Sequence, residues 1–386
     1  MGVTGKGLNY PKKYNYHKKT GSMKPRSNLV HVISFSIASM VLLSCYCDIS
    51  AQIVDIWAVG DGEKIFKHRT EHPAKKENSI WNGERISLRG LYNEVLGFQV
   101  IVEVDSTGAK GLELSMNPPL HKQSGRTIGG IGAIPYGDHG YIEFFSQHYL
   151  QVKRATEPNW FYGSENSAPA EMTGWIPDAL IPADALAGKG GFPLDIPPTQ
   201  EQVYRHQNIV DVIPRRASLN QGFWVDLYLP RDMNYPAGVY ESEIQVWVSG
   251  VLFASIPVRI ELLDAYLPDE NHSNVWMYNS GPESLRNYFS ELDKQEIRRM
   301  IKFEAKRHRI DLVGGFEAHQ SAFNEAILTD YKPFLDGSAY TPALGYHGPG
   351  EGIGENLFPV GMYGARILGT TKELSLIHIS EPTRLN

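Results

Sequence analysis

The sequence predicts a multidomain chain in which an antiparallel β-sandwich is followed by the start of a parallel α/β sheet. Short runs of alternating apolar and polar residues, separated by turn residues, fill positions 52–266. From residue 267 the period changes, and one strand–helix–strand unit follows. The roughly 320 residues between the two atypical ends exceed one typical hydrophobic core, so two domains are expected.

Residues 1–51 are expected to be an N-terminal extension and a signal peptide. Met23 is the preferred start, because Lys24 and Arg26 form a basic region before an apolar run from Leu29 to Leu43. That run has about the length of a signal peptide's apolar region, and it is shorter than a bilayer-spanning helix. A transmembrane anchor is the alternative.

Two cleavage sites remain open. The segment that ends at Cys45 resembles a lipoprotein signal with an atypical third residue, and it would leave Cys45 as a lipid-anchored first residue. The segment that ends at Ala51 would suit an ordinary signal peptidase and leave Gln52 first. Either way we expect an exported protein that is periplasmic, anchored in the outer membrane, or extracellular.

The expected β-sandwich contains several clear strands. One is Val95–Val102, and another is Phe223–Leu229, which is followed by a turn that ends at Gly238. Two further strands, one on each side of the two-residue turn Ser249-Gly250, have alternating apolar and polar residues. Their expected inward residues are Tyr240, Ser242, Ile244, Val246 and Val248, then Leu252, Ala254, Ile256, Val258, Ile260 and Leu262. Together these strands predict an antiparallel meander, whereas the Pro-rich segment 160–214 is expected to form long irregular loops.

The second domain is expected to span residues 267–373, after a turn-like linker at Leu267–His272. Asn274–Tyr278 is predicted to be a buried strand, and Asp293–Glu296 is a capping box that opens a helix. The apolar spacing continues to His308, and Ile310–Gly315 is the next strand. This is one βα unit of a parallel sheet.

Several stretches resemble the bacterial glycoside hydrolase 123-like group, including members with the DUF4091 domain. They are the segment from Asn93 to Val102, the hairpin from Gly222 to Val248, the linker Leu267–His272 and the segment from Asp336 to Gly364. The resemblance implies a β-sandwich plus a (β/α)8 barrel, here the incomplete start of that barrel. It also implies hydrolysis of N-acetylhexosamine glycans, in which an adjacent Asp-Glu pair orients the acetamido nucleophile and supplies the proton.

The adjacent pair Asp269-Glu270 does not fit that role. It precedes the first barrel strand, whereas barrel active sites form at the carboxyl ends of the strands. A complete barrel needs about 250 residues, and the last segment, from Leu374 to Asn386, resembles a translated sequencing adapter. We therefore expect an N-terminal fragment that lacks the catalytic dyad and is itself inactive.

Candidate substrate-binding residues follow the two predicted barrel strands. Asn279 comes after the first strand, and Glu317 and His319 come after the second. Amide, carboxylate and imidazole groups at this end of a barrel can hydrogen-bond a sugar, so an oligosaccharide or polysaccharide is the expected partner. The catalytic residues stay unassigned.

Other chemistries are disfavoured. The only cysteines, Cys45 and Cys47, lie in the signal segment, so the mature chain has no thiolate metal ligand. The net charge is −6 and the mature part has no basic patch, which argues against nucleic acid.

His68–His72 matches the zinc pattern H-x-x-E-H but lies in a β-rich loop. Gly348–Gly354 has G-x-G spacing without a strand-to-helix context, so a pliable loop is expected, and no metal or cofactor is expected.

The sequence thus predicts an exported glycoside hydrolase-like protein that acts on glycans, including those that contain N-acetylhexosamine. The alternative is a non-catalytic carbohydrate-binding or scaffold protein of the cell envelope, because one fold hosts many functions.

The signal segment gives the first testable prediction. Mass spectrometry of the exported protein should find a mature chain that starts at Cys45 or Gln52, because either peptidase removes everything before its site. Sensitivity to globomycin would distinguish the lipid-anchored form. Recovery of exported protein that still carries residues 1–22 would contradict the prediction.

Overall fold

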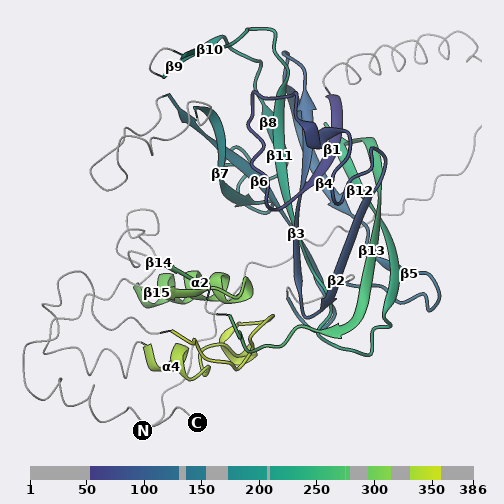
Figure 1. The fold of residues 1–386 in the computed structure, drawn as a ribbon, viewed down its shortest axis with the longest axis vertical. Coiled ribbons are helices and arrows are strands. Elements are labelled where there is room, and N and C mark those ends of the chain that lie inside the picture. Colours follow the sequence, from purple (N-terminus) through teal and green to yellow (C-terminus); the bar gives the residue numbers. More distant parts are fainter. Residues whose placement is uncertain are drawn as a thin grey trace, which may run out of the picture. The chain divides into compact units, whose positions relative to one another are not determined.

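The computed structural model describes residues 53–129, 136–153, 173–206, 209–273, 275–278, 294–313 and 331–357. Most of the regular structure in these residues is antiparallel β-sheet, and the helices are few (Figure 1). Within these ranges no helix is long and apolar enough to cross a membrane.

One sheet of the β domain, called sheet A below, has five antiparallel strands. Their order across the sheet is β1 (Ile53–Gly60), β3 (Val95–Val104), β11 (Leu219–Tyr228), β6 (Tyr141–Val152) and β7 (Gly174–Pro182). β11 is the central strand and pairs with β3 on one side and β6 on the other (Figure 1).

The second sheet, sheet B, faces the same core. Its order is β2 (Ile86–Tyr92), β13 (Val251–Tyr266), β12 (Gly238–Val248), β4 (Ala109–Met116) and β8 (Leu194–Ile196), and β5 (Leu120–His121) also pairs with β12. The pairings are antiparallel except for β2 with β13, which run parallel.

Apolar residues from both sheets share one core, as the predicted sandwich requires. Phe223, Val225 and Leu227 of β11 are fully buried in it, and so are alternate residues of β12 and β13 such as Ile244 and Ile260. Each such side chain contributes about 1.5–3 kcal/mol on burial. The alternation predicted for β12, and for β13 from Ile256 onward, is confirmed.

The predicted meander is wrong. β11 lies in sheet A, whereas β12 and β13 lie in sheet B, so the segment between Leu229 and Gly238 crosses from one sheet to the other. Alternation identifies the residues that face the core, but both sheets face the same core. The sequence pattern therefore could not assign each strand to its sheet.

The predicted turn between β12 and β13 is confirmed. Ser249 and Gly250 both have positive φ, 50° and 76°, as a two-residue type I′ hairpin requires. A register shift after Val246 then pairs Trp247 with Leu252. Because of this irregularity Leu252 is 44% exposed, although the alternation predicted it to be inward.

The Pro-rich segment, expected to be loops, contains strands where it is described. These are β7, β8 and the hairpin formed by β9 (Gln202–His206) and β10 (Ile209–Ile213). Pro177 is tolerated in β7 because β7 is the last strand of sheet A, where a missing N–H can face away from the sheet. Residues 154–172 lie outside the described ranges.

The predicted strand–helix–strand unit is present. β14 (Trp276–Tyr278) and β15 (Asp311–Val313) pair in parallel, and α2 (Lys294–Arg307) connects them in sequence. β14 was expected to be buried, but Val275, Trp276 and Met277 are 50–58% exposed. In the described part of the second domain β14 and β15 are the one parallel pair, so the (β/α)8 barrel is not confirmed.

Three short helical turns complete the described elements. They are η1 (Pro73–Lys75), α4 (Lys332–Leu335) and η6 (Pro342–Leu344).

Phe303 of α2 packs with Phe334, Tyr340 and Tyr346 in a second, smaller core. On α2 the buried residues are Ile297, Lys302, Phe303 and Lys306, whereas Met300 is 49% exposed.

Two glycines with similar backbone geometry give a test of this packing. Gly108 and Gly250 both have positive φ, 79° and 76°. A Cβ at Gly108 would lie 2.1 Å from the Ile196 carbonyl oxygen, whereas one at Gly250 would meet no atom within 4 Å. Gly250→Ala should cost about 1 kcal/mol from φ alone. Gly108→Ala should cost at least about 2 kcal/mol more, measured by urea unfolding. Equal losses would argue against the close approach of β8 to this turn.

Candidate functional site

The three sequence-predicted site residues, Asn279, Glu317 and His319, lie outside the described residues. The strands that precede them are described. Trp276 pairs with Asp311 and Tyr278 with Val313, so the two parallel strands end at the same level. Asn279 directly follows Tyr278, and the segment with Glu317 and His319 follows Val313. The carboxyl edge of β14 and β15 is therefore the part of the predicted site that the structure describes.

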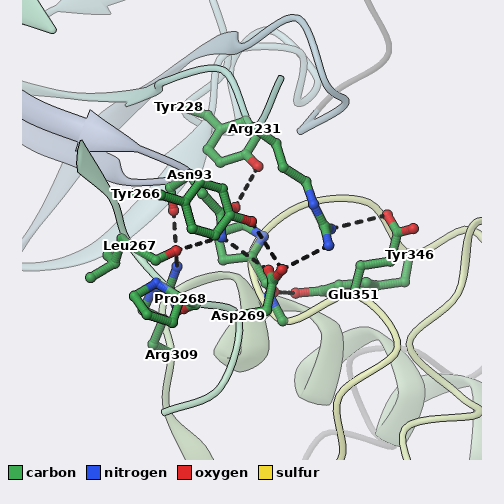
Figure 2. A network of polar contacts seen from close by, with 12 residues as sticks. Asn93, Tyr228, Arg231, Tyr266, Leu267, Pro268, Asp269, Arg309, Tyr346 and Glu351 are labelled. Carbon is green, nitrogen blue, oxygen red and sulfur yellow. Dashed lines mark hydrogen bonds and ion pairs between the residues drawn. The ribbon is translucent and has the colours of Figure 1, made fainter. Parts of the chain in front are cut away.

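The chain that leads into β14 is fixed by the carboxylate of Asp269 (Figure 2). Its Oδ2 accepts hydrogen bonds from Arg231 Nη2 at 2.7 Å and from the Tyr266 hydroxyl at 3.0 Å. Its Oδ1 accepts from Asn93 Nδ2 and from the Gly350 backbone N–H, both at 2.9 Å. Asp269 thus joins four segments that are distant in the sequence.

These bonds give Asp269 a structural role. The Arg231 ion pair is well shielded, with side-chain exposures of 26% for Arg231 and 16% for Asp269. Burial, together with the charge of Asp269, raises the pKa of Tyr266 to about 12, so its hydroxyl stays a donor. Each carboxylate oxygen of Asp269 thus accepts two hydrogen bonds within this network.

Asn93 extends the same network. It adopts a positive φ of 66°, which Asn tolerates better than most residues. Its Oδ1 accepts from the Tyr228 hydroxyl at 2.8 Å, and its Nδ2 also donates to the Leu267 carbonyl at 2.9 Å. Arg309, which follows α2, donates to the carbonyls of Asn93 at 2.9 Å and Pro268 at 2.5 Å. The segment Leu267–His272, predicted to be a turn-like linker, is therefore hydrogen-bonded both to Asn93 of the β domain and to Arg309 after α2.

A buried ion pair attaches α2 to the C-terminal described segment. Lys302 Nζ lies 2.7 Å from Glu355 Oε2, with side-chain exposures of 7% and 5%, and also donates to the Leu312 carbonyl at 3.1 Å. The Tyr340 hydroxyl donates to Glu355 Oε1 at 2.5 Å. Burying two charges costs free energy, and the attraction between them offsets this cost only when further hydrogen bonds of this kind are present.

Two further charged groups lie beside this pair. Lys306 Nζ donates to the Gly354 carbonyl at 3.0 Å, and burial lowers its pKa. Asp311, the first residue of β15, accepts from the Asn356 backbone N–H at 3.2 Å; burial, followed by the charge of Glu355, raises its pKa. Both groups lie at or near the amino end of β15, which is opposite to the candidate edge. At the amino ends of such strands side chains contribute to stability.

The loop Gly348–Gly354, expected to be pliable, is hydrogen-bonded and its first three residues are buried. Besides the bond from Gly350 to Asp269, the Gly352 N–H donates to the Tyr340 carbonyl at 2.7 Å. A Cβ at position 350 would lie 2.6 Å from Lys306 Cε. Gly350 also has a positive φ of 76°, which favours glycine at this position.

The H-x-x-E-H match does not form a metal site. His68 to His72 are not helical, so the two imidazoles do not share a helix face. His72 Nδ1 accepts from the Ala74 N–H at 3.3 Å, and its ring stacks on Trp57 at 5.9 Å. Among the described residues, no three His, Cys, Asp or Glu side chains are grouped to hold a metal ion.

Sequence reasoning missed the charged residues that organise this region. Asp226 lies in the apolar run from Phe223 to Leu229, and Lys302 and Lys306 lie on the buried face of α2. A charged residue inside an otherwise apolar strand, such as Asp226, is the signal that the sequence offered for a buried charge. The helical spacing of α2 offered no such signal for Lys302 and Lys306.

Comparison with solved structures gave several matches. No protein-family model matches the chain, and no curated protein matches it. A family 123 glycoside hydrolase from Clostridium perfringens, described for glycolipid glycan hydrolysis, aligns with a TM-score of 0.43 and 12% identity. The alignment covers 67% of this chain and 37% of the enzyme, so the chain spans well under half of the enzyme's length. The fold assignment rests on the strand pairings above.

The different environments of Asp269 and Glu270 generate a prediction. Asp269→Ala should destabilise the protein by about 2–4 kcal/mol, because it removes the nearer carboxylate partner of Arg231 and the acceptor of three other hydrogen bonds. Glu270 is exposed, so Glu270→Ala should cost less than about 0.5 kcal/mol. Urea unfolding of the two variants measures the difference, and equal stability would contradict the role assigned to Asp269.

Proposed function

We propose that this chain is part of an exported, glycoside hydrolase-like protein that acts on glycans, including those that contain N-acetylhexosamine. The parallel pairing of β14 and β15 is the observation that supports the proposal. Carboxyl ends of neighbouring parallel strands meet at one edge, which is where substrates bind in barrels and open α/β sheets. Asn279, Glu317 and His319 follow these two ends in the sequence.

The chemistry of the three residues suits sugar binding. An amide donates and accepts, a carboxylate accepts from hydroxyl groups, and a neutral imidazole can do either. Hydrolysis also needs an acid of raised pKa next to the glycosidic oxygen and a group that holds the acetamide. Asp269 is engaged by four donors, so we propose that these acids are supplied by another part of the parent protein.

A non-catalytic glycan-binding protein of the cell envelope is the second candidate. The four bonds to Asp269 favour it, because they remove from chemistry one member of the only adjacent Asp-Glu pair in the second domain. The two candidates share a ligand and differ in turnover, so one experiment can separate them.

The test measures binding and turnover on the same samples. Calorimetric titration with an oligosaccharide that ends in N-acetylhexosamine should show binding by the chain. Asn279→Ala and Glu317→Gln should weaken it roughly tenfold each, as expected for loss of hydrogen bonds to a polar ligand. Glu84→Gln, a change at an exposed carboxylate of the β domain, is the matched control and should bind like the wild type.

Hydrolysis is followed with aryl N-acetylhexosaminides. The chain alone should release no phenol, whereas the parent protein should do so if it is an enzyme and should not if it is a binder. Hydrolysis by the chain itself that is abolished by Glu270→Gln would overturn the role assigned to the 269–270 pair. Unchanged titrations for both edge variants would overturn the proposed binding site.

A further inference from the structure

A buried carboxylate lies on the face of sheet A that is turned away from the sandwich core. Asp226 of β11 has a side chain that is 3% exposed, and its Oδ1 accepts from Trp224 Nε1 at 2.7 Å. Glu143 of β6 is its direct cross-strand partner. Two carboxylates at directly opposed positions of an antiparallel pair repel each other unless protons or cations intervene.

The end of α2 covers this pair. His308, in the turn after α2, has its Nε2 at 3.5 Å from Asp226 Oδ2 and 3.4 Å from Glu304 Oε1. Arg307 pairs with Glu304 at 3.2 Å, and its guanidinium lies over the Tyr136 ring at 4.9 Å. The Tyr136 hydroxyl in turn lies 3.5 Å from Asp226 Oδ2. The imidazole thus stands between a carboxylate of the sheet and a carboxylate of the helix.

The charges in this contact do not balance when His308 is neutral. The facing groups are Asp226 from β11, Glu143 from β6, and Glu304, Arg307 and His308 from α2 and its turn, with the uncharged hydroxyls of Tyr136 and Tyr141 beside them. Three carboxylates against one guanidinium leave a formal charge of −2. A proton on His308 reduces it to −1, and a second proton, on Asp226 or Glu143, removes it.

We propose that this contact is an acid-tightened clasp, in which protons taken up by His308 and by the Asp226–Glu143 pair fasten the C-terminal turn of α2 to sheet A. The clasp is separate from the proposed glycan site, and it would hold the β14–α2–β15 unit more firmly in mildly acidic surroundings.

The directions of the pKa shifts agree with the geometry. The hydrogen bond to Glu304, opposed by burial and helped by the charge of Asp226, raises the pKa of His308. Burial raises the pKa of Asp226, and burial followed by the charge of Glu304 raises that of Glu143. The bond to His308 lowers the pKa of Glu304.

The sign of the pH dependence follows. A group whose pKa is raised by folding binds protons more tightly in the folded protein, so its stabilisation is lost as the pH rises through the folded pKa. His308, Asp226 and Glu143 all act in this direction. Glu304 acts in the opposite direction and loses its contribution only as the pH falls below the ordinary glutamate range. The clasp is therefore strongest between these limits, in mild acid.

Hydrogen exchange of α2 tests the proposal on the whole chain. Protection of the amides in 301–307, corrected for the intrinsic exchange rate, should be about fivefold or more higher at pH 5.5 than at pH 8.0. Asp226→Asn mimics the protonated carboxyl, so its protection at pH 8.0 should equal or exceed that of the wild type. His308→Gln should lose the rise at pH 5.5, and His272→Gln, a change at an exposed histidine, should keep it.

A second measurement does not depend on the variants. NMR titration of the wild type should give the His308 imidazole a pKa above the ordinary histidine value, because His308 faces two carboxylates. Protection that is flat or increases with pH would overturn the clasp. So would a His308 pKa at or below the ordinary histidine value, or a His308→Gln variant with the pH dependence of the wild type.

Discussion

The carboxylate of Asp269 is the point on which the arrangement of the β domain and the βα unit depends. Its four donors come from the turn between β2 and β3, from the crossing between the sheets, from the end of β13 and from the glycine loop near residue 350. A partly buried carboxylate costs free energy unless all of these donors are in place. The network therefore forms only when the three distant segments that carry Asn93, Arg231 and Gly350 are in place. It disfavours other positions of the segment that leads into β14.

Sequence reasoning predicted local structure well and assembly poorly. The alternation of β12 and the type I′ turn at Ser249-Gly250 were readable because both depend on neighbouring residues. The assignment of β11 and β12 to different sheets was not, since both strands face one core and show the same pattern. The exposed position of Leu252 depends on a register shift, which alternation cannot reveal.

The same division holds for the functional regions. The strand–helix–strand pattern correctly located the carboxyl edge that Asn279 follows, because strand polarity is fixed by chain direction. The buried charges were missed, since helical periodicity treats Lys302 and Lys306 as surface residues, although their long stems let them reach acceptors inside. Pairing partners such as Glu355, more than 50 positions away from Lys302, are set by tertiary contacts that a local pattern does not contain.

β13 links the two parts of the chain in a mechanically distinctive way. Its 16 residues run antiparallel to β12 and parallel to β2, and its last residue, Tyr266, leads directly to Asp269. A force that draws the βα unit away from the β domain along this strand loads both ladders of backbone hydrogen bonds in shear. Many bonds then share the load, whereas a force across the strand would open them one after another. Sheet B can therefore act as a stiff coupling that passes tension to the part of the protein that follows it.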